Sequence, residues 1–194
     1  NYNLIYNNKA INRYKKDIFE ISGDKAESLE KLKKSISSIK NCELKNNSTN
    51  NVFSDGNPKS KIMLIGEGPG SNEDQEGIPF VGRAGMLLDK MLASIDLDRK
   101  NVYITNVVNY RPPENRRPTE IEITKYLPYL KKHIEIISPK IVILLGSTAM
   151  NALIGNDEVI SKVRGKWINK QFGDCKTSLI VTFHPAFLIR QPAQ

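Results

Sequence analysis

The chain has 194 residues, of which 39% are hydrophobic and 26% are charged, and its formal net charge is +8 at pH 7. This length favours one compact domain with a hydrophobic core over two domains. No stretch approaches the roughly 18 apolar residues of a membrane-spanning helix, so we expect no membrane partner, and the basic balance suits an anionic partner such as nucleic acid.

The chain begins with a polar, mixed segment. We expect residues 1–23 to form a loosely docked N-terminal extension and residues 24–194 to form a single domain. Within that domain, the spacing of apolar residues predicts a helix over 24–40. The apolar face of this helix consists of Leu29, Leu32, Ile36 and Ile39. The segment 46–60 is rich in Asn, Ser, Asp and Gly, which predicts a loop.

Four short apolar segments predict β-strands, and helices alternate with them. The strands are expected at 62–65, 101–108, 140–145 and 179–183. A helix over 83–95 is expected to bury Leu87, Leu88, Met91, Leu92 and Ile95. Thr119 and Glu122 form a capping-box pattern that opens another helix, and Gly155 is expected to end a short helix after the third strand. Residues 156–177 show no regular pattern, so we expect irregular structure there.

This alternation of strands and helices predicts an α/β fold. Helices that connect parallel strands cover both faces of the sheet. We therefore expect a three-layer α/β/α domain with a central four-stranded parallel sheet. The carboxyl ends of its strands should share one edge, where open α/β sheets bind their ligands.

The two cysteines, Cys42 and Cys175, lie far apart in the sequence. Their number and spacing exclude a disulfide framework and the common zinc-binding patterns. Free thiols are typical of proteins in a reducing compartment. We therefore expect an intracellular protein.

A glycine-rich segment follows the first expected strand. Gly66, Gly68 and Gly70 allow the backbone to turn sharply and to approach a ligand closely. The segment lacks the Gly-Lys-Ser/Thr sequence of a phosphate-binding loop, and Glu67 and Pro69 depart from the dinucleotide-binding pattern. A tight turn without any ligand is the alternative interpretation.

Three of the four expected strands end in polar residues whose side chains can take part in catalysis or ligand binding. Glu67 follows the first strand, Asn106 lies near the end of the second, and His184 follows the fourth. Because parallel strands end at the same edge of a sheet, these side chains should converge on one crevice. A single histidine is also often a structural residue, so both interpretations of His184 stay open.

Each of these residues has a chemical use and a structural alternative. Asn106 offers a donor and an acceptor that can read the edge of a planar base, or it can cap the turn after its strand. Phe80 can stack on that base or belong to the core. His184 can stabilise negative charge on a leaving group, and Glu67 can orient water or stabilise a cationic, sugar-like transition state. Basic residues that can contact phosphates, or else be solvated surface residues, are Arg111, Arg116, Arg117, Lys166 and Arg190.

Five sequence motifs together resemble the uracil-DNA glycosylase superfamily, and they are most similar to its bacterial and archaeal family 4 group. The motifs are Gly66-Glu-Gly-Pro-Gly70 with Glu73-Asp74, Pro79-Phe-Val-Gly-Arg-Ala-Gly85, Tyr103-Ile-Thr-Asn-Val-Val108, Arg111-Pro-Pro-Glu-Asn-Arg-Arg-Pro-Thr119 and His184-Pro-Ala-Phe-Leu-Ile-Arg190. The resemblance implies a DNA repair glycosylase that flips deoxyuridine out of DNA and hydrolyses its N-glycosidic bond. Uracil is released and an abasic site remains, as in base excision repair.

The resemblance also implies roles for the matching residues. Glu67 and His184 are expected to be catalytic. The substrate-binding residues are expected to be Gly66, Gly68, Asp74, Phe80 and Asn106. Contacts with DNA are expected from Arg83, Arg111, Arg116, Arg117, Pro185 and Arg190. We expect a monomeric protein in a prokaryote-like cytoplasm, associated with the nucleoid.

Two other functions stay open at this point. A catalytically weak or inactive module on the same fold could bind DNA or damaged DNA. A hydrolase of free nucleotides is also compatible with such a sheet, although the basic loop 111–118 and Arg190 favour a polymer substrate.

The chain departs from the family pattern at the cofactor. Family 4 members usually hold a 4Fe–4S cluster, which takes four cysteine ligands. Here the four corresponding positions are Ile39, Cys42, Tyr110 and Tyr126. Because one thiolate remains of four, we predict neither this cluster nor another metal cofactor. We expect Ile39, Tyr110 and Tyr126 to fill the vacated volume as a small apolar plug.

Overall fold

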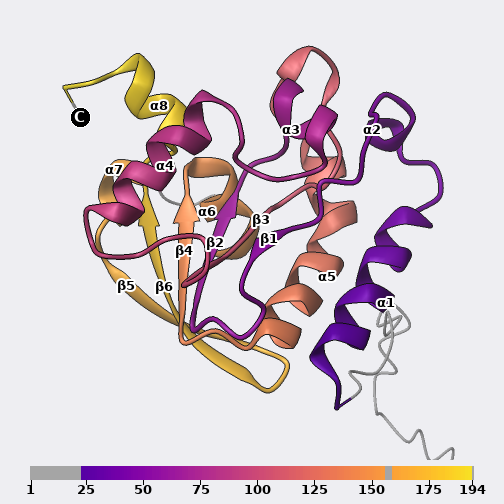
Figure 1. Ribbon diagram of the computed structural model, residues 1–194, viewed down its shortest axis with the longest axis horizontal. Coiled ribbons are helices and arrows are strands. Elements are labelled where there is room, and N and C mark those ends of the chain that lie inside the picture. The colour runs from indigo at the N-terminus through magenta and orange to yellow at the C-terminus, as the bar shows by residue number, and fades with distance from the viewer. Residues whose placement is uncertain (1–22, 156–158, 194) are drawn as a thin grey trace, which may run out of the picture.

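A six-stranded sheet forms the centre of the computed structural model, which describes residues 23–155 and 159–193 (Figure 1). Its strand order is β1-β3-β2-β4-β6-β5. The strands are β1 (Asp55–Gly56), β2 (Ile62–Gly66), β3 (Tyr103–Asn106), β4 (Ile141–Leu145), β5 (Trp167–Phe172) and β6 (Cys175–Thr182). Apart from Gly23, the extension expected at residues 1–23 lies outside the described residues.

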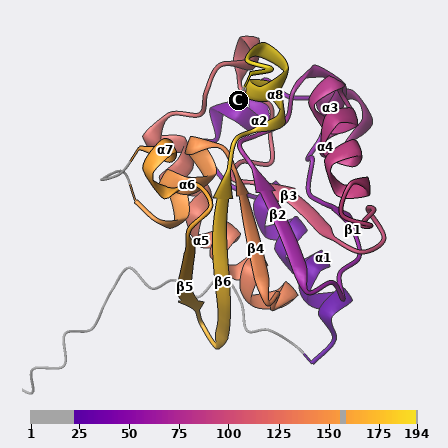
Figure 2. The same cartoon turned by 90° about the vertical axis from the view of Figure 1, so that its left-hand side faces the viewer.

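Helices cover both faces of this sheet. They are α1 (Lys25–Ser37), α2 (Glu43–Asn46), α3 (Ser71–Glu76), α4 (Arg83–Ala93), α5 (Glu120–Ile137), α6 (Ser147–Leu153), α7 (Ile160–Val163) and α8 (Pro185–Arg190), with a 3-10 turn at Pro113–Asn115. α1 packs against α5 over one face, and α4 packs against α8 over the other (Figures 1 and 2). This arrangement confirms the predicted three-layer α/β/α fold.

The four central strands, β3, β2, β4 and β6, run parallel, as expected. An antiparallel strand that the sequence did not predict lies at each edge. β1 has only two residues and lies inside the polar segment 46–60. The side chains of β5 alternate between solvent and sheet, so its sequence lacks a continuous apolar run. The expectation of irregular structure over 156–177 was therefore wrong, since α7, β5 and the start of β6 lie there.

Two layers of buried side chains form the core, one on each face of the sheet. On β2, Met63 and Ile65 join the layer beneath α1 and α5, whereas Leu64 joins the layer beneath α4. Successive side chains of a strand point to opposite faces, so a central strand needs apolar residues on both. This double burial explains the uninterrupted apolar run before the glycine-rich loop.

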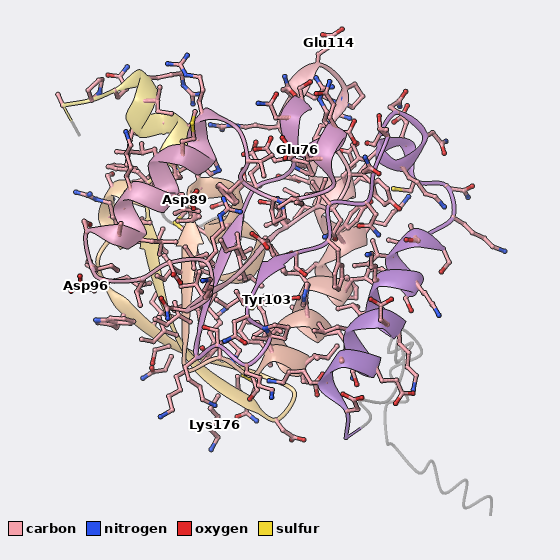
Figure 3. All side chains as sticks on the ribbon, viewed as in Figure 1. Glu76, Asp89, Asp96, Tyr103, Glu114 and Lys176 are labelled. Atoms are coloured by element: carbon pink, nitrogen blue, oxygen red, sulfur yellow. The ribbon has the colours of Figure 1, made fainter. Side chains whose placement is uncertain are left out.

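A buried polar network joins β3 to α5. Tyr103 lies near the middle of the molecule (Figure 3) and donates a hydrogen bond to Ser54 Oγ at 2.7 Å. Its oxygen is then left to accept from His133 Nε2, which lies 2.8 Å away. The His133 ring also stacks on Phe53 at 4.6 Å. Burial lowers the pKa of His133 to about 3, so this histidine is a neutral structural residue.

The helix predictions succeed except near two ends. The buried face of α1 contains Leu29, Leu32 and Ile36, as expected, but α1 ends at Ser37, so Ile39 lies beyond the helix and packs against the core from there. The capping box is confirmed, because Thr119 N donates to the Glu122 carboxylate at 2.7 Å and Glu122 N donates to the Thr119 hydroxyl at 3.2 Å. Of the residues expected inside α4, Leu88 and Leu92 are buried, whereas Leu87 and Met91 are only half-buried. The prediction for Ile95 was wrong: α4 ends at Ala93, and Ile95 is 60% exposed.

The carboxyl ends of the parallel strands lie at one end of the molecule, beside α3 and α8 (Figure 1). β2 leads into the glycine-rich loop, β4 into α6, and β6 into α8. Across residues 23–155 and 159–193, no helix has the length and apolar character needed to cross a lipid bilayer.

Candidate active site

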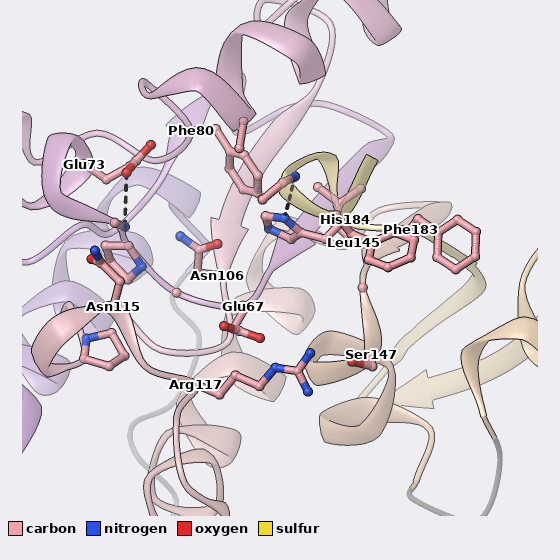
Figure 4. A pocket seen from close by; sticks show the side chains of 18 of the residues that line it. Glu67, Glu73, Phe80, Asn106, Asn115, Arg117, Leu145, Ser147, Phe183 and His184 are labelled. Atoms are coloured by element: carbon pink, nitrogen blue, oxygen red, sulfur yellow. Dashed lines mark hydrogen bonds between the residues drawn. The ribbon is translucent and has the colours of Figure 1, made fainter. Parts of the chain in front are cut away.

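A cavity of about 440 Å³ opens at the carboxyl edge of the sheet (Figure 4). It brings together Glu67 from the end of β2, Asn106 from the end of β3 and His184 from the end of β6. The predicted convergence of these three side chains on one crevice is therefore confirmed. Other expected site residues in the cavity wall are Gly68, Phe80, Arg116, Arg117 and Arg190.

Asn106 presents an unsatisfied acceptor to this cavity. The residue is 3% exposed, and its Oδ1 has no hydrogen-bond partner in the part of the chain that the structure describes. A buried polar atom without a partner costs about 1–3 kcal/mol, so such atoms are rare outside functional sites. A ligand with an N–H donor would satisfy this oxygen.

Gly66 leaves room for two of the cavity's side chains. It pairs with Asn106 in the last register of the β2–β3 ladder. A Cβ at this position would clash with Asn106 Oδ1 and would lie 2.5 Å from Phe80 Cζ. Gly66 is absent from the cavity wall itself, and its contribution is the close approach that only glycine permits.

Phe80 has a left-handed backbone conformation, with a φ of 57°, that is costly for an aromatic residue. Arg99 supports it by donating hydrogen bonds to the carbonyl oxygens of Phe80 and Pro79, the latter at 3.0 Å. Arg99 is itself held by Asp55 at 2.7 Å and by Asp89 at 2.9 Å. Arg99 could not be predicted from the sequence, because it lies 19 residues away from Phe80 in the chain and outside every recognised motif.

His184 is a neutral hydrogen-bond donor in this cavity. Its Nδ1 accepts from Ala186 N at 3.1 Å, so the ring proton is placed on Nε2. Burial, followed by the nearby charge of Arg190, lowers the pKa of His184 to about 4, against a smaller opposing effect of Glu73. The ring also stacks on Phe80, with 5.6 Å between the centroids.

Glu67 is fixed at both its backbone and its side chain. Val108 N donates to the Glu67 carbonyl oxygen at 3.2 Å, which extends the strand pairing by one step. The Thr148 hydroxyl, from the first turn of α6, donates to Glu67 Oε2. Thr148 was also missed by the sequence analysis, because 81 residues separate it from its partner.

The two acids that follow the glycine-rich loop hold protein backbone. Glu73 accepts hydrogen bonds from Gly70 N, Val81 N and Gly82 N at 2.8–3.1 Å, and it lines the cavity. Asp74 was expected to bind substrate, but it lies outside the cavity wall. Its buried carboxylate accepts instead from the amides of Thr49 and Asn50, at 2.9 and 3.1 Å.

The basic residues divide into two groups. Arg116, Arg117 and Arg190 line the cavity, and Arg116 forms an ion pair with Glu122 at 2.7 Å. Figure 4 shows the Arg117 guanidinium group extending past Glu67 toward Ser147. The expected DNA-contact residues that lie outside the cavity wall are Arg83, Arg111, Lys166 and Pro185.

The opposite side of the cavity is apolar. Phe183 and Phe187 line it with their rings 4.9 Å apart, and Ile160 lies beside them. The Arg164 guanidinium group stacks over Phe183 at 4.6 Å. Phe183 and Phe187 were not predicted as site residues, because aromatic side chains just after a strand are more typical of the core. Ile160 and Arg164 lie at the two ends of α7, in the segment for which no regular structure was expected.

The positions that correspond to cluster ligands form a packed, buried group. Cys42, Tyr110 and Tyr126 belong to the core, and Ile39 packs against it. Cys42 Sγ lies 3.1 Å from Tyr126 Oη in a buried hydrogen bond. Among the described residues, no group of three or more His, Cys, Asp or Glu side chains is placed to hold a metal ion. These residues therefore do not fit a 4Fe–4S cluster, which needs four thiolates.

Comparisons with known proteins point in the same direction as the cavity. The family model of the uracil DNA glycosylase superfamily matches residues 53–194. A type-4 uracil-DNA glycosylase of Sulfurisphaera tokodaii is 45% identical over 171 residues, which are 86% of this chain and 78% of that protein. A type-4 uracil-DNA glycosylase of Archaeoglobus fulgidus is 41% identical over 170 residues, 86% and 85% of the two chains. One of Thermotoga maritima is 45% identical over 150 residues, 77% of each chain.

Proposed function

The chain belongs to the uracil-DNA glycosylase superfamily, and we propose that it excises uracil from DNA by hydrolysing the N-glycosidic bond of deoxyuridine. The observation that carries this proposal is the buried Oδ1 of Asn106, which has no hydrogen-bond partner across residues 23–155 and 159–193. It lies in one cavity with the Phe80 ring and the Nε2–H of His184. Each group meets a different feature of a uracil base.

Asn106 matches the polar edge of uracil. Its Oδ1 accepts from the N3–H of the base, and its Nδ2 donates to the neighbouring O4. Cytosine has no hydrogen at N3 and carries an amino group at C4, so it reverses both contacts. Phe80 supplies an aromatic face on which the flipped base stacks.

The base reaches the cavity only when it leaves the helical stack. Flipping costs about a few kcal/mol and is easiest at a mismatch or in a single strand. The cationic side chains of Arg117 and Arg190 line the cavity, and we expect them to attract the phosphates of the flipped nucleotide.

Bond cleavage separates a cationic sugar from a uracil anion. The Nε2–H of neutral His184 donates to O2 of the base as negative charge develops there. The Glu67 carboxylate stabilises the cationic sugar and orients a water molecule toward C1′. Water adds to C1′, its proton passes through Glu67 to solvent, and the uracil anion takes up a proton from solvent.

The binding-module alternative has less support. Loss of activity would be expected to leave substitutions or misplaced groups in the cavity, yet Glu67, Phe80, Asn106 and His184 are all present there. The relatives reported above carry the name of the enzyme, and their similarity extends over most of this chain.

The function is tested with labelled oligonucleotides that contain one uracil, followed by alkaline cleavage of abasic sites. Single-stranded, U·G and U·A substrates run in parallel, with the variants Asn106→Ala and His184→Ala. We expect cleavage by the wild-type protein and a loss of orders of magnitude in both variants. Intact DNA binding without cleavage would instead favour the binding module.

We further propose that the enzyme works without an iron–sulfur cluster. The buried contact between Cys42 and Tyr126 and the packing of Tyr110 support this. After anaerobic incubation with iron and sulfide, the wild-type protein should lack visible absorbance and bound iron. A triple variant that restores cysteines, Ile39→Cys with Tyr110→Cys and Tyr126→Cys, serves as the positive control. Stoichiometric iron in the wild-type protein would contradict the proposal.

We propose that the protein acts as a monomer in the cytoplasm, at the nucleoid of a prokaryote. One copy of the chain supplies every group that the proposed reaction uses, namely Glu67, Phe80, Asn106 and His184. Both cysteines are buried free thiols that suit a reducing compartment. Light scattering of the purified protein with and without a uracil-containing oligonucleotide tests the monomer, and a dimer in both conditions would contradict it.

A further inference from the structure

We propose that Thr148 is a positioning residue for catalysis, because its hydroxyl fixes the carboxylate of Glu67 in the orientation that water activation requires. The inference rests on the proposed glycosylase function and deepens it. Thr148 acts through Glu67, and it lies outside the cavity wall itself.

The fold gives the Thr148 hydroxyl a fixed position. β4 lies beside β2, so the start of α6 lies next to the loop that carries Glu67. Gly146 turns the chain between β4 and α6 with a φ of 93°, a conformation that favours glycine. Thr148 is 8% exposed, and its neighbours Ala149 and Met150 are buried in the core.

The hydrogen bond leaves the two carboxylate oxygens in different states. Oε2 accepts from Thr148, whereas Oε1 has no hydrogen bond within the described part of the chain. Figure 4 shows this carboxylate inside the cavity, between Asn106 and the Arg117 side chain. One oxygen is therefore anchored to the protein, and the other is left for water or for the sugar.

A glutamate needs such an anchor more than a shorter acid does. Its side chain has three rotatable bonds, and each additional rotamer removes the carboxylate from the reacting geometry. The backbone bond from Val108 fixes only the start of this side chain. Without the hydroxyl, the carboxylate would occupy several orientations in a cavity of about 440 Å³.

The test is the substitution Thr148→Val, which keeps the shape of the side chain and removes the hydroxyl. We expect the single-turnover rate at saturating substrate to fall by about ten- to a hundredfold, the usual weight of a hydrogen bond to a charged group. The affinity for uracil-containing DNA should stay within about twofold, because Thr148 does not line the cavity. Thr148→Ser retains the hydroxyl and should restore most of the rate.

Thr177 offers a matched control. It is also buried, at 5% exposure, but its hydroxyl has no hydrogen-bond partner among the described residues, and it lies on β6 outside the cavity wall. Thr177→Val makes the same chemical change and should leave the excision rate unaffected. A matching loss of rate in Thr177→Val and Thr148→Val would overturn the inference, since buried threonines in general would then be responsible.

A double-mutant cycle separates positioning from structural damage. If Thr148 acts through Glu67, then Thr148→Val should have almost no effect on the residual rate of the Glu67→Ala protein. The same fold-loss in both backgrounds would overturn the inference. If the wild-type protein fails to cleave uracil-containing DNA, the proposed function is overturned and this inference with it. If the wild-type protein is active and Thr148→Val is equally active, this inference alone is overturned.

Discussion

Gly66 and Asn106 face each other in the last register of the β2–β3 ladder, and a side chain on Gly66 would occupy the space of Asn106 Oδ1. The strand pairing that ends at this position therefore places the side-chain amide of Asn106 in the cavity. Among the described residues this acceptor has no hydrogen-bond partner, and Gly66 leaves the space beside it free of any side chain of its own. The fold thus keeps a hydrogen-bonding group ready for a ligand.

The variant Gly66→Ala should lose about a hundredfold in excision rate, because a displacement of the order of 1 Å in a reacting group has such an effect. The added Cβ displaces Asn106 and would lie 2.5 Å from Phe80 Cζ. Single-turnover kinetics on a uracil oligonucleotide measure the loss. Gly23→Ala, where a Cβ would meet nothing within 4 Å, is the control. Full activity of Gly66→Ala would show that the close approach is unimportant.

The variant Asn106→Ala should lose activity without losing stability. It removes a buried acceptor that has no partner among the described residues, so the free energy of unfolding should be unchanged or higher, while excision falls by about a hundredfold or more. Urea unfolding and single-turnover kinetics measure both quantities.

Asn109 is the matched control for this prediction, at the other end of the same short segment. Its Nδ2 donates to Val52 O at 3.1 Å and to Phe53 O at 3.3 Å. Asn109→Ala should therefore lower the free energy of unfolding by about 1–3 kcal/mol. If Asn106→Ala proves to be the more destabilised of the two, the amide of Asn106 serves the fold rather than a ligand.

Much of the fold could be predicted because periodic burial leaves a local pattern. The run Met63, Leu64 and Ile65 is apolar on both faces of a central strand, and the face of α1 repeats at helical spacing. β5 could not be predicted in this way, since one of its faces is open to solvent. Ile95 was misplaced because apolar periodicity continued past the residue where α4 ends.

The convergence of site residues on one cavity could be predicted from the topology of the sheet. The residues that hold those side chains in place could not be predicted. Glu67, Asn106 and His184 each end a strand, and parallel strands end together. Arg99 and Thr148 act through hydrogen bonds to residues that are distant in sequence, 19 and 81 positions away. Such contacts leave no local spacing to recognise. Asp74 resembled a ligand-binding acid, but its position on the buried side of α3 directs its carboxylate to the amides of Thr49 and Asn50.

The stability of the protein should fall between pH 8 and pH 5 because of His133. Its pKa is about 3 in the folded state, and an exposed histidine has a pKa of about 6.5. Below pH 6.5 the unfolded chain binds a proton that the folded protein excludes, so stability is full above that pH and is lost as the pH falls. The loss should reach about 2 kcal/mol at pH 5.

The variant His133→Leu isolates this contribution, because His184 titrates in both proteins and cancels. Urea unfolding at pH 8 and pH 5 should show a decrease in the free energy of unfolding that is about 2 kcal/mol smaller in the variant. Equal decreases in the two proteins would mean that His133 gains protons in the folded state as readily as in the unfolded state.

The plug of Ile39, Tyr110 and Tyr126, together with Cys42, should stabilise the fold. Tyr126→Phe removes the buried hydrogen bond with Cys42, and the free energy of unfolding should fall by about 1 kcal/mol. Tyr129→Phe, in the same helix, is the control, since its hydroxyl has no hydrogen bond among the described residues. Uracil excision should be unaffected by either change, because neither residue lines the cavity. A stability that is unchanged by Tyr126→Phe would leave packing alone as the role of the plug.

Arg117 should contribute a phosphate contact. It lines the cavity, it has no ion pair within the described part of the chain, and it points past Glu67 (Figure 4). Arg117→Gln should weaken binding of single-stranded DNA and reduce the slope of log affinity against log salt by about 0.7, the value for one released counterion. Lys33→Gln makes the same change in net charge on the exposed side of α1, away from the cavity, and should leave the slope unaltered. If Arg117→Gln and Lys33→Gln have equal slopes of log affinity against log salt, Arg117 acts only through the overall charge of the protein. The phosphate would then bind elsewhere on the basic surface.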